Sequence, residues 1–163
     1  MKKNAYLRPL FSDQVVEIDA TDGTETIAKA TDVFKGWIDG DFVKCGLNKK
    51  EQSTPVVPVT IYELKKDGTF ADMFGSLGNI DDICFEQSQV KGFCRKHHCK
   101  LRKDGYATLF LIKNGKRVKK DKSNVFVVCV FVGVSGLEVL VHRFSLDEVW
   151  PATDRNRFVS LQQ

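Results

Sequence analysis

The sequence predicts an α+β fold in which an antiparallel sheet (a meander over 106–144 plus edge strands) is covered by one long and two short helices. Three apolar segments, Tyr106–Ile112, Val125–Val132 and Leu137–Phe144, are rich in β-branched and aromatic residues and are bounded by turn residues. The middle segment is almost wholly apolar, which predicts a strand buried on both faces. Helical patterns mostly precede these strands, an order typical of α+β proteins rather than of parallel sheets.

The N-terminal part predicts one short strand and the long helix. Gln14–Asp19 has the alternation of a strand. From Glu25 to Cys45, apolar residues recur every three or four positions, as on one face of a helix. Asp22 and Glu25 fit a capping box at its start. Gly36 and Gly40 would weaken its last turns, because glycine costs about 1 kcal/mol against alanine inside a helix.

The middle of the chain predicts an edge strand and the two short helices. Val56–Leu64 reads as a strand, and Pro58 places it at a sheet edge, because proline donates no ladder hydrogen bond. Thr69 with Asp72 fits the cap of one short helix. A second helix is expected over residues 87–98.

After the first central strand, Asn114-Gly115 predicts a turn within a polar, basic loop from Lys113 to Ser123. Leu146–Trp150 is expected to form a helical turn that covers the sheet with Trp150. Arg157–Leu161 is expected to be a last edge strand.

Length and composition indicate a single globular domain over residues 1–163. The chain is 42% apolar and 28% charged, and no apolar run approaches the ~20 residues of a membrane-spanning helix. Met1 begins a basic stretch with no apolar segment behind it, so a cytoplasmic location is expected. The five cysteines are odd in number and irregularly spaced, which favours reduced thiols over a disulfide framework.

Charge is distributed unevenly along the chain. Residues 1–90 carry 10 Lys and Arg against 15 Asp and Glu, whereas residues 91–163 carry 15 against 6. Such asymmetry suggests a basic face and a polyanionic partner, although solvated lysines on loops are the ordinary alternative. The candidate nucleic-acid-binding residues lie in two segments and are Arg95, Lys96, Lys100, Arg102, Lys103, Lys113, Lys116, Arg117, Lys119, Lys120 and Lys122.

A metal site is one alternative function for the segment around residues 94–99. Cys94, His97, His98 and Cys99 are zinc-ligand types in one short stretch. A closed structural site needs four ligands, usually as two separated pairs, and the remaining nearby group, Cys84, is at no recognised spacing. Cys94 also falls on an apolar helical face, where cysteine behaves as a small hydrophobe. The sequence therefore favours a core cysteine and predicts no metal and no cofactor.

Catalytic motifs are the second alternative. Trp37–Phe42 is similar over six residues to the motif of the LAGLIDADG homing endonucleases, but Asp39 and Asp41 would not share a helical face and bulky residues replace the small ones of that family. No nucleophile elbow, phosphate-binding loop, dinucleotide fingerprint or H-E-x-x-H helix occurs. This favours a binding module without excluding an enzyme.

Four tracts, 69–77, 104–111, 141–150 and 157–159, resemble small uncharacterised bacterial proteins that are often encoded with phage or other mobile-element genes. The resemblance carries no site residues. It implies an accessory role in DNA handling or in phage–host conflict.

The sequence thus predicts a small non-enzymatic module that contacts nucleic acid or a nucleoprotein through a basic patch. The alternative is a protein-binding inhibitor or regulator, encoded by a phage or mobile element, that antagonises a host or defence protein. The expected partners are nucleic acid or an acidic protein. A homodimer through the sheet edge near Pro58 belongs to that alternative. A metal-dependent enzyme using the Cys94–Cys99 cluster or Asp39 and Asp41 is the third hypothesis, and no membrane partner is expected.

Overall fold

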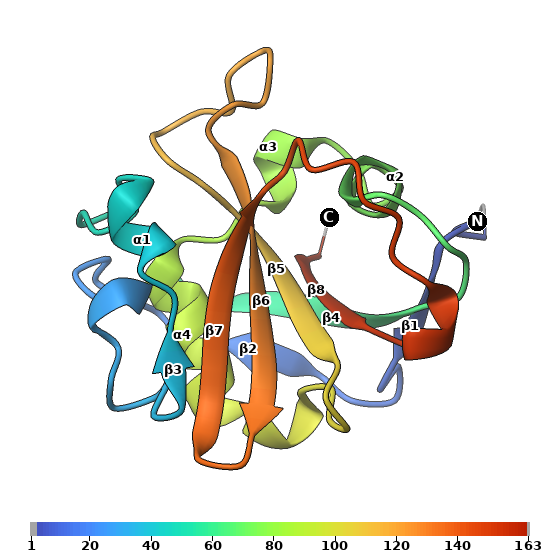
Figure 1. Cartoon of the computed structure of the whole chain (residues 1–163), viewed down its shortest axis with the longest axis horizontal. Coiled ribbons are helices and arrows are strands. Elements are labelled where there is room, and N and C mark those ends of the chain that lie inside the picture. The colour runs from blue at the N-terminus through green and yellow to red at the C-terminus, as the bar shows by residue number, and fades with distance from the viewer. Residues whose placement is uncertain (1–2, 163) are drawn as a thin grey trace.

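A computed structural model describes residues 3–162, which form one mixed sheet with short helices on both of its faces (Figure 1). The strand order is β1-β4-β8-β5-β6-β7-β3, and β2 also pairs with β4. The strands are β1 (Leu7–Leu10), β2 (Val16–Ile18), β3 (Trp37–Ile38), β4 (Val57–Leu64), β5 (Ala107–Lys113), β6 (Val125–Gly133), β7 (Gly136–Arg143) and β8 (Arg157–Leu161).

The three central strands are confirmed. β6 pairs antiparallel with β5 on one side and with β7 on the other, so that Cys129 lies between Leu109 and Leu140. Every residue from Val125 to Val130 is buried. The continuous apolar run in the sequence therefore corresponds to a strand covered on both faces, as expected for such a pattern.

The prediction of a purely antiparallel sheet was wrong, because two of the observed strand pairings are parallel. β8 runs parallel to β5, with Thr108 opposite Arg157, and β3 runs parallel to β7, with Trp37 opposite Glu138. Periodicity marks a segment as a strand but does not specify its neighbour. The choice of neighbour depends on contacts between residues far apart in the chain.

β4 and β8 were both expected at an edge, and both lie inside the sheet. β4 pairs with β8 along one side and with β1 and β2 along the other. Pro58 is tolerated there because it precedes the β4–β8 register, which begins at Val59, while its carbonyl accepts a hydrogen bond from the Gln162 backbone at 3.2 Å. The strand edge near Pro58 is therefore occupied by β2 and β8 within the chain.

The predicted long helix over 25–45 does not form. The segment instead contains the 3₁₀ turn η1 (Ile27–Lys29), strand β3 and the short helix α1 (Asp41–Lys44). Gly36 shows why: a Cβ there would lie 2.7 Å from the Gly136 carbonyl oxygen, and the Gly36 backbone donates to Leu137. Close pairing with β7 thus replaces the helix, yet Ile27, Ala30, Phe34 and Phe42 are still buried in one cluster.

The helices cover both faces of the sheet. α4 (Gln87–Lys96) packs with η1 and α1 against the face that carries Phe110 and Ile112. The opposite face, with Leu109 and Leu111, is covered by α2 (Phe70–Gly75) and α3 (Ile80–Ile83). Two separate apolar layers therefore flank the sheet.

The local predictions around α2 and α4 are largely confirmed. Thr69 and Asp72 form the predicted capping box, with hydrogen bonds of 3.0 and 3.2 Å. α4 ends two residues early at Lys96 and is followed by η2 (His98–Lys100). Residues 146–150 are not helical, but Trp150 covers α2 by stacking on Phe70 at 5.3 Å between ring centroids. A further 3₁₀ turn, η3 (Ala152–Asp154), leads into β8.

Candidate nucleic-acid interface

The two basic segments lie at opposite ends of β5. Residues 95–103 precede this strand and residues 113–122 follow it, and the loop between β5 and β6 projects from the end of the molecule away from the last turn of α4 (Figure 1). Seven residues at about 3.3 Å each separate the two segments by roughly 20 Å. They therefore do not form the single patch that the sequence suggested.

Two cations of the first segment are paired with acids from the first half of the chain. Arg95 lies 3.2 Å from Asp32, and Lys96 lies 2.7 Å from Asp19. The remaining members bind elsewhere: Lys100 donates to Gln14, Arg102 pairs with Asp104 and donates to the carbonyls of Asp154 and Arg155, and Lys103 is exposed. The charge asymmetry of the sequence is thus partly cancelled within the fold.

Lys91 pairs with acids of the same region and is more deeply buried than Arg95 and Lys96. Its side chain is 7% exposed, and its ammonium lies 2.7 Å from Glu25 and 3.1 Å from Asp32. The hydrogen bond from Lys91 holds the pKa of Asp32 below its ordinary value. This cluster joins α4 to the segment around η1.

The second segment is a long loop fastened at its base. The Asn124 side chain donates to the carbonyls of Asn114 and Arg117 and accepts from the Lys119 backbone, each at 2.8 Å. The Asp81 carboxylate pairs with Lys113 and accepts from the Val118 backbone. Hydrogen bonding to Lys113 holds the pKa of Asp81 below its usual range. The base of the loop is therefore ordered by buried or half-buried groups.

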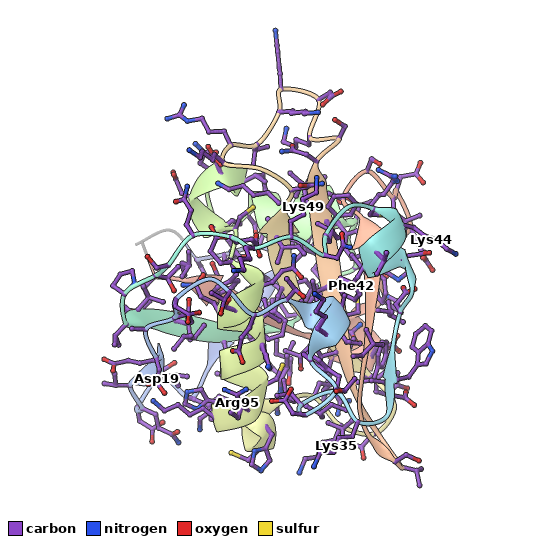
Figure 2. The ribbon with its side chains drawn as sticks, turned by 90° about the vertical axis from the view of Figure 1, so that its left-hand side faces the viewer. Asp19, Lys35, Phe42, Lys44, Lys49 and Arg95 are labelled. Carbon is purple, nitrogen blue, oxygen red and sulfur yellow. The ribbon has the colours of Figure 1, made fainter. Side chains whose placement is uncertain are left out.

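The cations beyond that base are exposed, and no carboxylate among the described residues lies within ion-pair distance of them. Two further lysines, Lys49 and Lys50, reach the same end of the molecule from the segment between α1 and β4, as Figure 2 shows for Lys49. We call this surface the basic end; it consists of Lys49, Lys50, Lys116, Arg117, Lys119, Lys120 and Lys122.

Sequence reasoning missed the contribution of Lys49 and Lys50. Both lie in a polar segment between α1 and β4, and only the tertiary contacts bring that segment against the turn at Asn114. The Asn114 side chain donates to the Cys45 carbonyl at 3.3 Å, which joins the two segments. The one sequence feature that could have indicated this contribution is the adjacent pair Lys49-Lys50.

A cleft of about 330 Å³ opens between these two segments. Four lysines lie around it, namely Lys49, Lys50, Lys113 and Lys116, and Asn114 and Gly115 form part of its wall. Glu51 and Glu86 line the same cleft, next to the first residue of α4. The cleft thus combines cationic and carboxyl groups.

The Glu51 carboxyl is held at the start of α4, beside Glu86. Glu51 Oε1 accepts a hydrogen bond from the Gln87 backbone at 2.8 Å. Burial, with a further contribution from the adjacent Glu86 carboxyl, raises the pKa of Glu51 to about 8. Because burial disfavours the charged carboxylate and the neighbouring Glu86 adds to this effect, Glu51 holds a proton near neutral pH.

The cysteine and histidine cluster is dispersed in the fold. Cys94 is buried in the core, where loss of solvation raises the pKa of its thiol, whereas His98 and Cys99 are exposed. The His97 ring makes a 2.7 Å hydrogen bond with the Glu17 carbonyl. Among residues 3–162, no three His, Cys, Asp or Glu side chains are placed to hold a metal ion together.

Asp39 and Asp41 serve the local backbone. Asp39 accepts hydrogen bonds from the backbones of Asp41 at 2.9 Å and Val141 at 3.2 Å. Asp41 begins α1 and lies 3.5 Å from Lys44. Trp37 and Ile38 form a strand, so this stretch lacks the helix on which the homing-endonuclease motif depends.

Comparison with protein-family models, with curated proteins and with solved structures found no match for this chain. No helix in the described part of the chain is both long enough and apolar enough to cross a membrane.

Proposed function

We infer that the protein is a non-enzymatic module that binds nucleic acid through the basic end. The observation that carries this proposal is the contrast between the two basic segments. The cations of 95–103 are mostly paired within the fold, whereas those of the basic end are exposed and unpaired among the described residues. Unpaired cations on an ordered loop are available to phosphate groups.

Phosphate contacts explain why such a surface suits nucleic acid. Lysine and arginine that neutralise phosphates release condensed counterions, so binding of this kind weakens steeply as salt rises. The basic end presents seven cations from two segments joined by Asn114. Its lysines supply point charges without base-reading geometry, which favours backbone contact over sequence recognition.

The test removes charge from the loop. Lys119, Lys120 and Lys122 are changed together to glutamine, and binding of a fluorescent single-stranded oligonucleotide is measured by anisotropy across a range of salt concentrations. If all three contact phosphates, the slope of log affinity against log salt falls by about 2. The matched control changes Lys29, Lys35 and Lys65, which are exposed outside the basic end, and leaves that slope unchanged.

Either of two results contradicts the proposal. One is the absence of oligonucleotide binding by the native protein at low salt, and the other is an equal affinity at low and high salt. Loss of binding in the control variant alone would move the interface to another surface.

A second candidate, binding of another protein, is favoured by Trp37. This side chain is 52% exposed on β3, the short strand at one edge of the sheet. Exposed tryptophan is enriched among residues that dominate protein interfaces. Co-purification of a partner by the native chain but not by Trp37→Ala would support it. An origin in a phage or mobile element stays a prediction under either function.

A further inference from the structure

We propose that the cleft between residues 46–52 and 113–116 takes a phosphate group of the bound nucleic acid, and that Glu51, beside Glu86, carries a proton while the phosphate is bound. The inference rests on the proposed function and specifies how one part of the basic end works. It predicts that binding is linked to proton uptake.

The cleft has the composition of a phosphate site that contains its own acid. Its 330 Å³ can hold a phosphate group with some water, and Lys49, Lys50 and Lys116 approach it from two segments. Lys113 also lines it but is already paired with Asp81. Three exposed ammonium groups are therefore available to the anion.

The carboxyl pair is held in place by the backbone around it. The Glu51 backbone donates to the Gly23 carbonyl at 3.0 Å, and its carboxylate accepts from the Gln87 backbone. Gly23 has φ +78° and approaches so closely that a Cβ there would lie 2.4 Å from the Glu51 carbonyl oxygen. The Glu86 backbone is bonded to the Gln89 side chain at 2.8 Å. Both carboxyl-bearing residues thus have fixed backbones at the cleft.

A phosphate in this cleft disfavours ionisation of the pair. A phosphate close to the Glu51 carboxyl raises the free energy of its ionised form, so bound phosphate raises the proton affinity of Glu51. The four lysines around the cleft oppose this effect, but they act on the pair in the free protein as well. By linkage, a ligand that raises a pKa binds more tightly when the proton is present.

The direction of the pH dependence follows. The pKa of Glu51 is about 8 in the free protein, so raising the pH through this value requires the pair to take up a proton on binding. The dissociation constant then increases with pH, by at most about tenfold per unit for one proton. The phosphodiester itself does not titrate in this range. The two histidines of this region, His97 and His98, lie after the C-terminal end of α4, whereas Glu86 lies at its N-terminal end, so the histidines are not part of the cleft.

The experiment measures oligonucleotide affinity from about pH 6 to pH 9 at constant salt. Calorimetry at pH near 8 in two buffers with different ionisation enthalpies counts the protons taken up. For the native chain we expect affinity to fall as the pH rises through about 8, and an uptake of up to about half a proton at pH near 8, because half of the free protein already holds that proton. Glu51→Gln should abolish both, because a glutamine cannot ionise.

Glu17→Gln is the matched control, since it removes one exposed carboxylate from β2, outside the cleft, and should keep the native pH dependence. Glu86→Gln provides a second test of the pair if Glu51→Gln folds poorly. Salt-dependent binding with no pH dependence and no proton uptake overturns this inference and leaves the proposed function intact. Absence of binding at every pH overturns both.

Discussion

The side-chain nitrogen of Gln87 donates a hydrogen bond to the Leu47 carbonyl oxygen at 2.6 Å. The side-chain oxygen of the same amide accepts from the Ile27 backbone at 3.0 Å. Gln87 is 2% exposed, so this one buried amide joins the start of α4 to η1 and to the segment that follows α1. It also fixes the segment that carries Lys49, Lys50 and Glu51.

We expect Gln87→Leu to lower the free energy of unfolding by about 2 kcal/mol or more, because it leaves a buried backbone donor and a buried acceptor without partners. Urea denaturation followed by tryptophan fluorescence measures the change. Gln52→Leu is the control, because Gln52 is exposed, and its effect should stay within about 0.5 kcal/mol. Equal effects would show that the Gln87 amide is not structurally important.

The stability of the native protein should decrease as the pH rises from about 4.5 to about 8, because Glu51 has a pKa of about 8 when folded against an ordinary value of 4.5. In this window the folded state binds more protons than the unfolded state, so raising the pH favours unfolding. Glu51→Gln should flatten the dependence and be more stable than the native protein at pH 9. Thermal unfolding over this pH range tests it, and an unchanged profile would contradict it.

Removing the acids around Lys91 should cost more than removing Lys91. Glu25→Gln with Asp32→Asn leaves a 7% exposed ammonium without a counterion, which we expect to cost about 3 kcal/mol. Lys91→Met leaves the two carboxylates, which are 43% and 59% exposed and remain hydrated, so the loss should be about 1 kcal/mol or less. Chemical denaturation at neutral pH compares the variants, and equal losses would refute the burial argument.

Asn124→Ala should loosen the loop between β5 and β6. The substitution removes three hydrogen bonds of 2.8 Å from a side chain that is 7% exposed, at an expected cost of about 1–3 kcal/mol. Trypsin should then cleave the loop faster, since its lysines are exposed. Asn48→Ala, at an exposed position, should leave the cleavage rate unchanged. No acceleration in Asn124→Ala would mean that the loop is ordered by other contacts.

Local patterns in the sequence determined the elements whose residues are close together in the chain. The three central strands follow from continuous β-branched and aromatic runs, and the α2 cap follows from Thr69 and Asp72, three residues apart. α4 follows from an apolar face repeated within ten residues. In each case the decisive interactions or burial pattern lie within one element or one hairpin, so spacing alone reveals them.

Tertiary structure alone decided which elements are neighbours. Residues 25–45 have helical spacing, but pairing of Gly36 with β7 prevents a continuous helix. Pro58 lies in a strand inside the sheet and not at its edge. The basic end likewise depends on the contact between Asn114 and Cys45, 69 positions apart. Such choices depend on shape and hydrogen bonding between distant segments, and the periodicity of either segment carries no information about the other.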